Sequence, residues 1–203
     1  MADRDGTRTA TVERLSRETQ LRCEVRLQEA MEEGPEIEVA TGLPFLDHMM
    51  EQTARYGGFA LRCLGHGDVH VDPHHLMEDT GIVVGQALSE ALGDRAGIRR
   101  FAFAYAPLDE SLARVVVDLG KRPFLSYNLP LRGRIGTLES ETLEEWWRAF
   151  SIHLGATINV DAIRGRNRHH LAESAFKALG LALRDAMAIS GSPGLPSSKG
   201  LLG

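Results

Sequence analysis

Apolar and polar residues alternate near the start of the chain, and further along the apolar residues recur at the spacing of a helix. Residues 8–28 show β-like alternation, clearest at Leu21, Cys23 and Val25, which predicts two strands that meet near Glu18. The pattern further predicts a strand at 37–39, a helix from Pro44 to about residue 56, a strand at 59–64 and a helix at 74–92. Glycines at 57–58 and 93 are typical of helix ends.

The second part of the chain repeats this order of elements. Strand patterns lie at 101–105, 112–119 and 125–129, followed by a helix from about 139 to 153, a strand at 157–163 and a long helix at 169–189. Gly155 follows the shorter helix, as Gly58 does in the first part. The residues after 191 are rich in Gly, Ser and Pro, which predicts a mobile tail.

The two parts match in residues as well as in the order of elements. The pattern His-His-x-x-Glu begins at His74 and again 95 positions later at His169, and Gly85 matches Gly180 at the same offset. The other matched pairs, at offsets of 92 to 97 positions, are Glu18 with Glu110, His48 with Glu145 and Gly58 with Gly155. A duplicated strand-strand-strand-helix-strand-helix unit is the simplest explanation.

This duplication predicts an α+β fold. We expect two sheets related by pseudo-two-fold symmetry, with helices covering one face of each. The predicted half-repeats are residues 8–95 and 96–190, followed by a tail at residues 191–203 that the family resemblance given below implies to contribute to the substrate site.

Composition narrows the class of function. The chain has 203 residues, 43% of them hydrophobic and 25% charged, which is typical of a globular protein. A formal net charge of -5 argues against a nucleic-acid or anionic-membrane surface, and therefore favours a small-molecule partner. Cys23 and Cys63 lie in apolar segments, which favours buried free thiols and a cytosolic location. We recognise no targeting signal and no stretch that approaches the ~18 apolar residues of a membrane span.

The repeated motif predicts a site for two metal ions. Adjacent histidines on a helix point about 100° apart, so one pair can serve two ions, while Glu three or four residues on lies over the same face. Imidazole and carboxylate without thiolate suit Mn, Fe, Zn, Co or Ni. One copy would be a weak signal, but two copies at matched positions predict a two-metal enzyme. The candidate ligands from the motifs are His74, His75, Glu78, His169, His170 and Glu173.

Two further ligands are predicted on the shorter helices. His48 and its repeat mate Glu145 occupy matching positions, and each follows an acidic residue, Asp47 or Glu144, that we expect to support the ligand by a hydrogen bond. For Glu145 the alternative is an ordinary exposed helix carboxylate.

Several basic residues are candidates for holding a phosphate group, which needs charged hydrogen-bond donors. Lys177 lies one turn past Glu173, on the helix face that we expect Glu173 and His170 to share. For the others, a solvated surface charge is the alternative. They are Arg99, Arg100, Arg122 and Lys199.

These residues together resemble the imidazoleglycerol-phosphate dehydratase family of histidine biosynthesis, from about residue 18 to residue 200. The motifs that carry the resemblance are Phe45-Leu46-Asp47-His48-Met49, Gly67-Asp68-Val69-His70, His74-His75-x-x-Glu78-Asp79, Pro107-Leu108-Asp109-Glu110, Arg122-Pro123, His169-His170-x-x-Glu173, Phe176-Lys177-Ala178 and Pro196-Ser197-Ser198-Lys199-Gly200.

The resemblance implies a cubic assembly of twenty-four subunits, with active sites at subunit interfaces that hold two manganese ions. It implies metal ligation by the eight candidate ligands named above. Glu18 and Gln52 would face the substrate, and Glu18 and Glu173 would transfer protons. The residues implied to hold the phosphate, some from a neighbouring subunit, are Arg100, Arg122, Lys177, Ser197, Ser198 and Lys199.

The implied reaction removes water from D-erythro-imidazole glycerol phosphate and gives imidazole acetol phosphate. The proton at C2 of this substrate is not acidic. If two metals bind the ring nitrogens, the ring becomes an imidazolate that expels the C3 hydroxyl through a diazafulvene-like intermediate.

Three residues depart from the family pattern. Glu145 stands where a histidine ligand is usual, Tyr56 where a substrate-facing histidine is usual, and Pro73 where an acidic residue is common. We expect the metal site to survive with altered affinity, because manganese accepts oxygen ligands. A two-metal phosphohydrolase acting on a small phosphate ester is the alternative enzyme, and a non-catalytic metal-binding protein is a third hypothesis.

Overall fold

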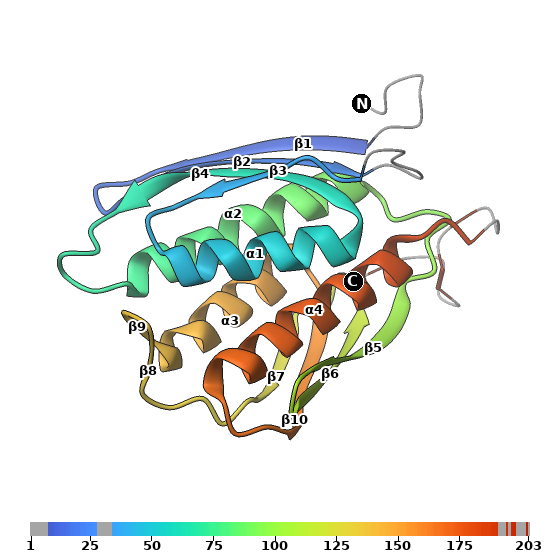
Figure 1. Ribbon diagram of the computed structural model, residues 1–203. Helices are drawn as coiled ribbons and strands as arrows, with labels where there is room; N and C mark the ends of the chain where they lie inside the picture. The colour runs from blue at the N-terminus through green and yellow to red at the C-terminus, as the bar shows by residue number, and fades with distance from the viewer. Residues whose placement is uncertain (1–7, 28–33, 191–193, 195, 198–201, 203) are drawn as a thin grey trace.

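Two four-stranded sheets form the outer layers of the molecule (Figure 1). The computed structural model describes residues 8–27, 34–190, 194, 196, 197 and 202. The first sheet has the order β1-β2-β4-β3, in which only β3 runs parallel to its neighbour. Its strands are β1 (Arg8–Leu15), β2 (Thr19–Leu27), β3 (Ile37–Ala40) and β4 (Phe59–Gly67).

The second sheet has the corresponding order β5-β6-β10-β7, again with one parallel pair at the end of the sheet. Its strands are β5 (Phe101–Leu108), β6 (Ser111–Asp118), β7 (Phe124–Asn128) and β10 (Thr157–Arg164). Strand order and direction therefore match between the two halves, and the predicted α+β duplication is confirmed. We keep the division into residues 8–95 and 96–190 as a proposal.

The four α-helices of the described residues lie between the sheets and cover one face of each (Figure 1). They are α1 (Pro44–Gly57), α2 (His74–Leu92), α3 (Leu143–Leu154) and α4 (Arg168–Met187). The two shorter helices end in the same way, because Gly58 and Gly155 both have a φ of 65°, in the left-handed region where glycine has no steric penalty. The two glycines therefore match in the repeat because both positions have a left-handed backbone conformation.

The helices pack in pairs, α1 with α4 and α3 with α2, and each pair has a close contact at a glycine. A Cβ added to Gly180 would lie 2.5 Å from the Thr53 carbonyl oxygen and 3.1 Å from the Tyr56 Cβ. A Cβ added to Gly85 would lie 2.9 Å from the Phe150 carbonyl oxygen and 3.2 Å from the His153 Cβ. Thr53 and Tyr56 are the repeat mates of Phe150 and His153, so the two crossings are equivalent. The duplication therefore extends to backbone contacts.

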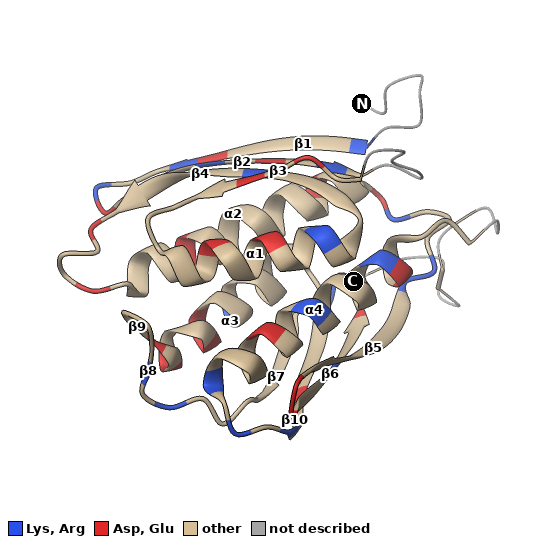
Figure 2. Ribbon diagram, viewed as in Figure 1, with Lys and Arg blue, Asp and Glu red and all other residues tan. Residues whose placement is uncertain are grey.

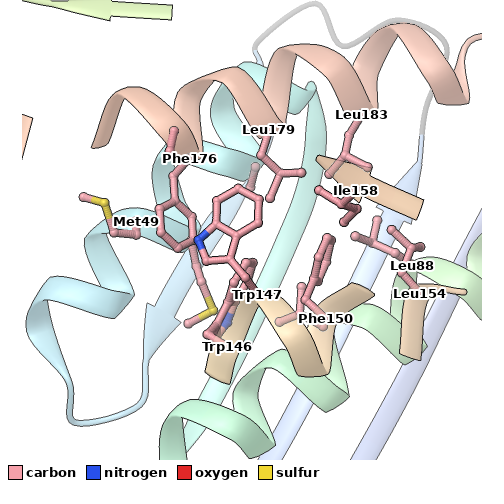
Figure 3. Close-up of a cluster of buried hydrophobic side chains, with 14 of the residues drawn as sticks. Met49, Leu88, Trp146, Trp147, Phe150, Leu154, Ile158, Phe176, Leu179 and Leu183 are labelled. Atoms are coloured by element: carbon pink, nitrogen blue, oxygen red, sulfur yellow. The ribbon is translucent and has the colours of Figure 1, made fainter. Parts of the chain in front are cut away.

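Aromatic side chains fill the space where the helix pairs meet (Figure 3). The Trp146 ring stacks on Phe150 with centroids 4.8 Å apart and planes inclined by 9°, and Trp147 and Phe176 close the cluster. In the first sheet, Cys23 and Cys63 face each other across β2 and β4 as buried free thiols, which confirms the prediction for both.

The connection before α3 differs from the prediction. A short hairpin of β8 (Arg134–Ile135) and β9 (Leu138–Glu139) is followed by a 3-10 turn, η1 (Ser140–Thr142), so α3 begins at Leu143 and not at residue 139. These strands of two residues are too short to produce a periodic pattern. Most of the predicted tail at 191–203 lies outside the described residues. None of the described helices is long and apolar enough to cross a membrane.

Candidate metal centre and substrate site

Three side chains from α1 and α4 converge at the start of α4. The ligating atoms of His48, His169 and Glu173 all lie within 4.8 Å of one another. The Glu173 Oε2 is 3.1 Å from the His169 Nε2 and 3.4 Å from the His48 Nε2. A divalent ion with bonds of about 2.1 Å needs only small side-chain shifts to bind all three. We name these residues the α1/α4 triad.

Lys177 and Gln52 border the triad. The Lys177 ammonium lies 2.7 Å from the Glu173 Oε1, and the Gln52 Nε2 lies 3.5 Å from the His48 Nδ1. Burial raises the pKa of Glu173, but hydrogen bonds from Lys177 and His169 outweigh it, and the net pKa lies below the usual value. The Glu173 carboxylate is therefore ionised and available as a ligand at neutral pH. Acidic and basic residues both occur along α4 (Figure 2).

A hollow of about 540 Å³ opens beside the triad. His48 and His169 line it together with Phe45, Val69 and Leu138. Its volume is within the range of small-molecule sites, and it places an apolar wall next to the ligating nitrogens.

His170 points away from the triad. Its ring is nearly perpendicular to that of His169, at 86°, and its Nδ1 lies 2.9 Å from the Glu110 Oε2. The Glu110 Oε1 accepts hydrogen bonds from the backbone N–H groups of Arg166 and Asn167. The hydrogen bond from His170, followed by those two, holds the pKa of Glu110 far below its usual range.

His75 has the corresponding arrangement in the first half. Its ring stands at 87° to that of His74, and its Nδ1 lies 3.1 Å from the Asp68 Oδ2. The hydrogen bond to Asp68 raises the pKa of His75. The Glu18 carboxylate is 3.9 Å from the same nitrogen, and its side chain is 55% exposed. The predicted proton-transfer residue Glu18 thus lies next to His75, whereas Glu173 belongs to the α1/α4 triad.

The other predicted ligands are His74, Glu78 and Glu145. Among the described residues, only the α1/α4 triad brings three ligating atoms within 4.8 Å of one another. The Glu145 Oε2 lies 3.9 Å from the Arg148 Nε. Because the two helix crossings are equivalent, these three residues occupy the positions on α2 and α3 that correspond to the triad on α4 and α1. The correspondence of these three residues to the triad rests on the repeat and not on direct contact, and their role as ligands stays a prediction.

The predicted phosphate-binding arginines lie at the other end of α4. The Arg100 backbone N–H donates to the Ala186 carbonyl near the end of that helix. At a rise of about 1.5 Å per residue, this is roughly 26 Å from His169. The Arg100 guanidinium forms two hydrogen bonds with Asp118, and a third, of 2.8 Å, with the Pro196 carbonyl next to Ser197. The remaining candidates, Ser198 and Lys199, lie outside the described residues.

Arg122 lies at the same end of the second sheet. Its carbonyl accepts a hydrogen bond from Thr157, which is paired with Asp118 across β10 and β6. Only Lys177 among the described phosphate candidates therefore lies beside the triad of its own chain.

Two expectations about supporting carboxylates are wrong. Asp47 accepts hydrogen bonds from the Thr41 backbone and hydroxyl and does not contact His48, and Glu144 pairs with Arg148 at 2.9 Å. Consecutive helix residues point about 100° apart, so neither can reach the ligand beside it. The carboxylates that do contact motif histidines are Asp68 and Glu110, and the sequence did not predict either contact. The sequence also predicted that His170 shares a helix face with Lys177 and Glu173, whereas in the structure His169 lies beside Glu173.

The comparison with protein families agrees with these motifs. A family model described as imidazoleglycerol-phosphate dehydratase matches residues 41–183. The chain belongs to the imidazoleglycerol-phosphate dehydratase family. The predicted resemblance is confirmed, and with it the hydro-lyase class.

Relatives with this name match nearly the whole chain. The imidazoleglycerol-phosphate dehydratases of Paraburkholderia xenovorans and Burkholderia lata are each 46% identical over 198 residues, which cover 96% of this chain and 100% of the relative.

Solved structures of the family share the fold. The imidazoleglycerol-phosphate dehydratase of Staphylococcus aureus is 36% identical with a TM-score of 0.78, covering 89% of this chain and 99% of its own. The corresponding values for IGPD from Pyrococcus furiosus are 34% identity, a TM-score of 0.81, and 94% and 100% coverage. The α+β fold is therefore the fold of the family.

Proposed function

We propose that this protein dehydrates D-erythro-imidazole glycerol phosphate to imidazole acetol phosphate in histidine biosynthesis, with two manganese ions in each active site. The observation that carries the proposal is the α1/α4 triad of His48, His169 and Glu173 in a chain of the imidazoleglycerol-phosphate dehydratase family. The two buried free thiols fit a reducing, cytoplasmic location.

The donor set fits divalent metals of the manganese type. The α1/α4 triad offers two imidazole nitrogens and one carboxylate oxygen, and we propose that His74, Glu78 and Glu145 form the repeat-related set. His75 and His170 complete the ligands, each with its Nδ1 occupied by a carboxylate and its Nε2 available. Bound metals would supply positive charge at the substrate ring and thus replace the carbonyl that usually acidifies a neighbouring C–H bond.

The protein's own carboxylates would move the protons. In the proposed reaction one group takes the proton from C2, and another protonates the hydroxyl that leaves C3. Glu18 and Glu173 are the candidates for these two roles, and the contacts of the two carboxylates differ, which suits different roles. Glu18 is exposed beside His75, whereas Glu173 is 8% exposed and held by Lys177.

We propose that the phosphate is held by Arg100, Arg122, Lys177, Ser197, Ser198 and Lys199, and that Gln52 contacts the substrate. Arg100 orients the start of the Pro196-Ser197 segment through the Pro196 carbonyl. A clamp of charged donors fixes the position of the reacting carbons, because phosphate binding supplies orientation far from the bond that breaks.

The proposed site needs more than one subunit. The Arg100 end of α4 is roughly 26 Å from the triad of the same chain, and His75 and His170 point away from their neighbouring histidines. We propose a homo-oligomer, twenty-four subunits in the family arrangement, in which one chain completes the site of another. The exposed aromatic residues Phe101, Phe103 and Tyr105 on β5 support burial against another copy.

Product analysis tests the reaction. Manganese-loaded protein is mixed with imidazole glycerol phosphate, and the ketone and free phosphate are measured in the same sample. We expect ketone without phosphate release. Phosphate release without ketone would instead establish the phosphohydrolase alternative.

A variant pair tests whether the metal-binding protein is an enzyme that uses Glu18. We expect Glu18→Gln to lower kcat on the order of 10²-fold or more, with manganese still bound. Glu13→Gln is the matched control, because Glu13 pairs with Arg22 on the outer face of the same hairpin. Equal turnover in both variants would remove Glu18 from the mechanism, and no turnover in the wild type would favour the non-catalytic hypothesis.

A further inference from the structure

Glu110 is held by three hydrogen bonds beside the motif histidine His170. It lies at the turn between β5 and β6, where Asp109 has a φ of 47°. One carboxylate oxygen accepts the Arg166 and Asn167 backbone N–H groups at 3.0 and 2.8 Å, and the other faces the His170 Nδ1 at 2.9 Å. The carboxylate therefore has one oxygen committed to the backbone and one to the imidazole.

This contact fixes which ring nitrogen of His170 carries the proton. A carboxylate only accepts hydrogen bonds, so the Nδ1 of His170 must donate. In the neutral ring the Nε2 then carries the lone pair. Asp68 has the same relation to His75, with carboxylate oxygens 3.1 and 3.3 Å from the Nδ1.

The two supporting carboxylates come from different elements. Asp68 directly follows β4, whereas the residue that directly follows β10 is Gly165. A Cβ at Gly165 would lie 2.5 Å from the Ser111 Oγ and 3.1 Å from the Ser111 Cβ, and Gly165 has a φ of 154°, so a side chain at this position would be strained. In that half the hairpin residue Glu110 has the role, and its repeat mate in the first half is Glu18.

We propose that Asp68 and Glu110 are positioning residues that hold the Nδ1–H of His75 and His170, so that each Nε2 presents a lone pair to a divalent metal, and that Asp68 thereby leaves Glu18 available for proton transfer. The metal and the role of Glu18 rest on the proposed function; the hydrogen bonds do not. Of the two repeat-related glutamates, Glu110 orients His170, whereas Glu18 does not orient His75, because Asp68 does so.

Glu110→Gln gives a sharp test of the tautomer. Only the amide oxygen of glutamine can accept the two backbone N–H groups, so its NH2 group must face the His170 Nδ1. The ring would then present its lone pair at the Nδ1 and carry its proton at the Nε2. We expect the ring 13C shifts of His170 in metal-free protein, followed by magic-angle-spinning NMR and assigned with His170→Gln, to change to those of the other tautomer.

Metal affinity is the second readout. We expect Glu110→Gln to weaken Mn2+ binding about 10- to 100-fold in calorimetry of the full chain. Asp68→Asn should weaken it less, because asparagine keeps an oxygen that can accept from His75. Glu141→Gln is the matched control, since Glu141 accepts the Gly133 backbone N–H but contacts no imidazole, and its Mn2+ affinity should stay within about twofold of wild type.

The outcomes separate this proposal from the proposed function. An unchanged His170 tautomer and unchanged Mn2+ affinity in Glu110→Gln would overturn it, provided that thermal unfolding shows a folded variant. If the wild type bound no Mn2+, the proposed function would fail, while the tautomer measurement would still decide the positioning role.

A double-mutant cycle tests whether Asp68 keeps Glu18 available for proton transfer. In Asp68→Ala we expect Glu18 to close the 3.9 Å gap to His75 and take over its Nδ1, so that kcat falls about as far as in Glu18→Gln. The double variant should then lose little further kcat, because the same group is removed twice. Multiplicative losses in kcat would show that Asp68 and Glu18 act independently, and would overturn this part of the proposal.

Discussion

Glu145 occupies the position on α3 that His48 occupies on α1. The two helices pack on α2 and α4 through equivalent glycine contacts, at Gly85 and Gly180. The metal set proposed on α2 and α3 therefore has two carboxylates and one imidazole, whereas the α1/α4 triad has two imidazoles and one carboxylate. The two proposed ions differ in environment, and the oxygen-rich set favours a harder ion.

Removing Glu145 should weaken one metal site and leave the other. We expect Glu145→Ala to bind one manganese ion tightly and the second at least about tenfold more weakly than wild type, and Glu145→His to bind zinc or nickel more tightly at that position. Calorimetry and metal analysis of the purified protein measure both effects. Glu144→Ala is the control, because Glu144 pairs with Arg148. Unchanged stoichiometry and affinity in Glu145→Ala would exclude Glu145 as a ligand.

The glycine at the crossing of α1 and α4 should not tolerate a methyl group. Alanine favours a helix over glycine by about 1 kcal/mol, but its Cβ at Gly180 would lie 2.5 Å from the Thr53 carbonyl oxygen. We expect Gly180→Ala to lower the free energy of unfolding by about 1–3 kcal/mol in urea titrations of metal-free protein. Arg184→Ala, at an exposed position of the same helix, should change it by less than about 0.5 kcal/mol. Equal or greater stability of Gly180→Ala would contradict the close crossing.

A buried arginine links the two halves of the molecule. Arg95 is 1% exposed, and its guanidinium donates to the carbonyls of Leu119 and Gly155 at 2.8 and 3.0 Å and also to the Leu154 carbonyl. Arg95→Met would leave these buried acceptors without a donor, and we expect a loss of about 3 kcal/mol in the free energy of unfolding.

Urea titration measures this loss, and a substitution at the exposed residue Arg99 is the control. Arg99→Met should have an unfolding midpoint close to that of wild type. If Arg95→Met were as stable as Arg99→Met, the stabilising role of these Arg95 hydrogen bonds would be wrong.

The paired thiols in the first sheet should be unreactive in the folded protein. The hydrogen bond with Cys63, and then burial, raises the pKa of Cys23 well above the ordinary 9.0. The folded thiol stays protonated where the unfolded one ionises, so its contribution to stability is complete below pH 9 and is lost as the pH rises further. Alkylation at pH 8, followed by mass spectrometry, should label both cysteines in urea and neither in native protein. Rapid labelling of native Cys23 would contradict this.

Much of the fold follows from local patterns in the sequence. The alternation of Leu21, Cys23 and Val25 identifies a strand with one buried face, and the glycines at 58 and 155 mark helix ends because they adopt left-handed φ values. The repeated His-His-x-x-Glu motif predicts the duplication and includes His169 and Glu173 of the α1/α4 triad among the candidate ligands, but which ligands group together comes from the structure.

The supporting groups could not be predicted in the same way. Asp68 and Glu110 approach His75 and His170 from a strand end and a hairpin turn, and nothing in their spacing along the chain fixes that proximity. Asp47 and Glu144 were adjacent in sequence and therefore expected, yet helix geometry turns them away. The separation of Arg100 from the triad likewise depends on the length of α4 and its packing.

Manganese dependence of the dehydration tests the central proposal most directly. Metal-stripped protein is assayed with imidazole glycerol phosphate in the presence of a chelator and then at increasing Mn2+ concentration. We predict no ketone with the chelator and ketone formation that saturates near two manganese ions per chain, without release of phosphate. Ketone formation at the same rate with the chelator, or none at any Mn2+ concentration, would contradict the proposed two-metal dehydratase.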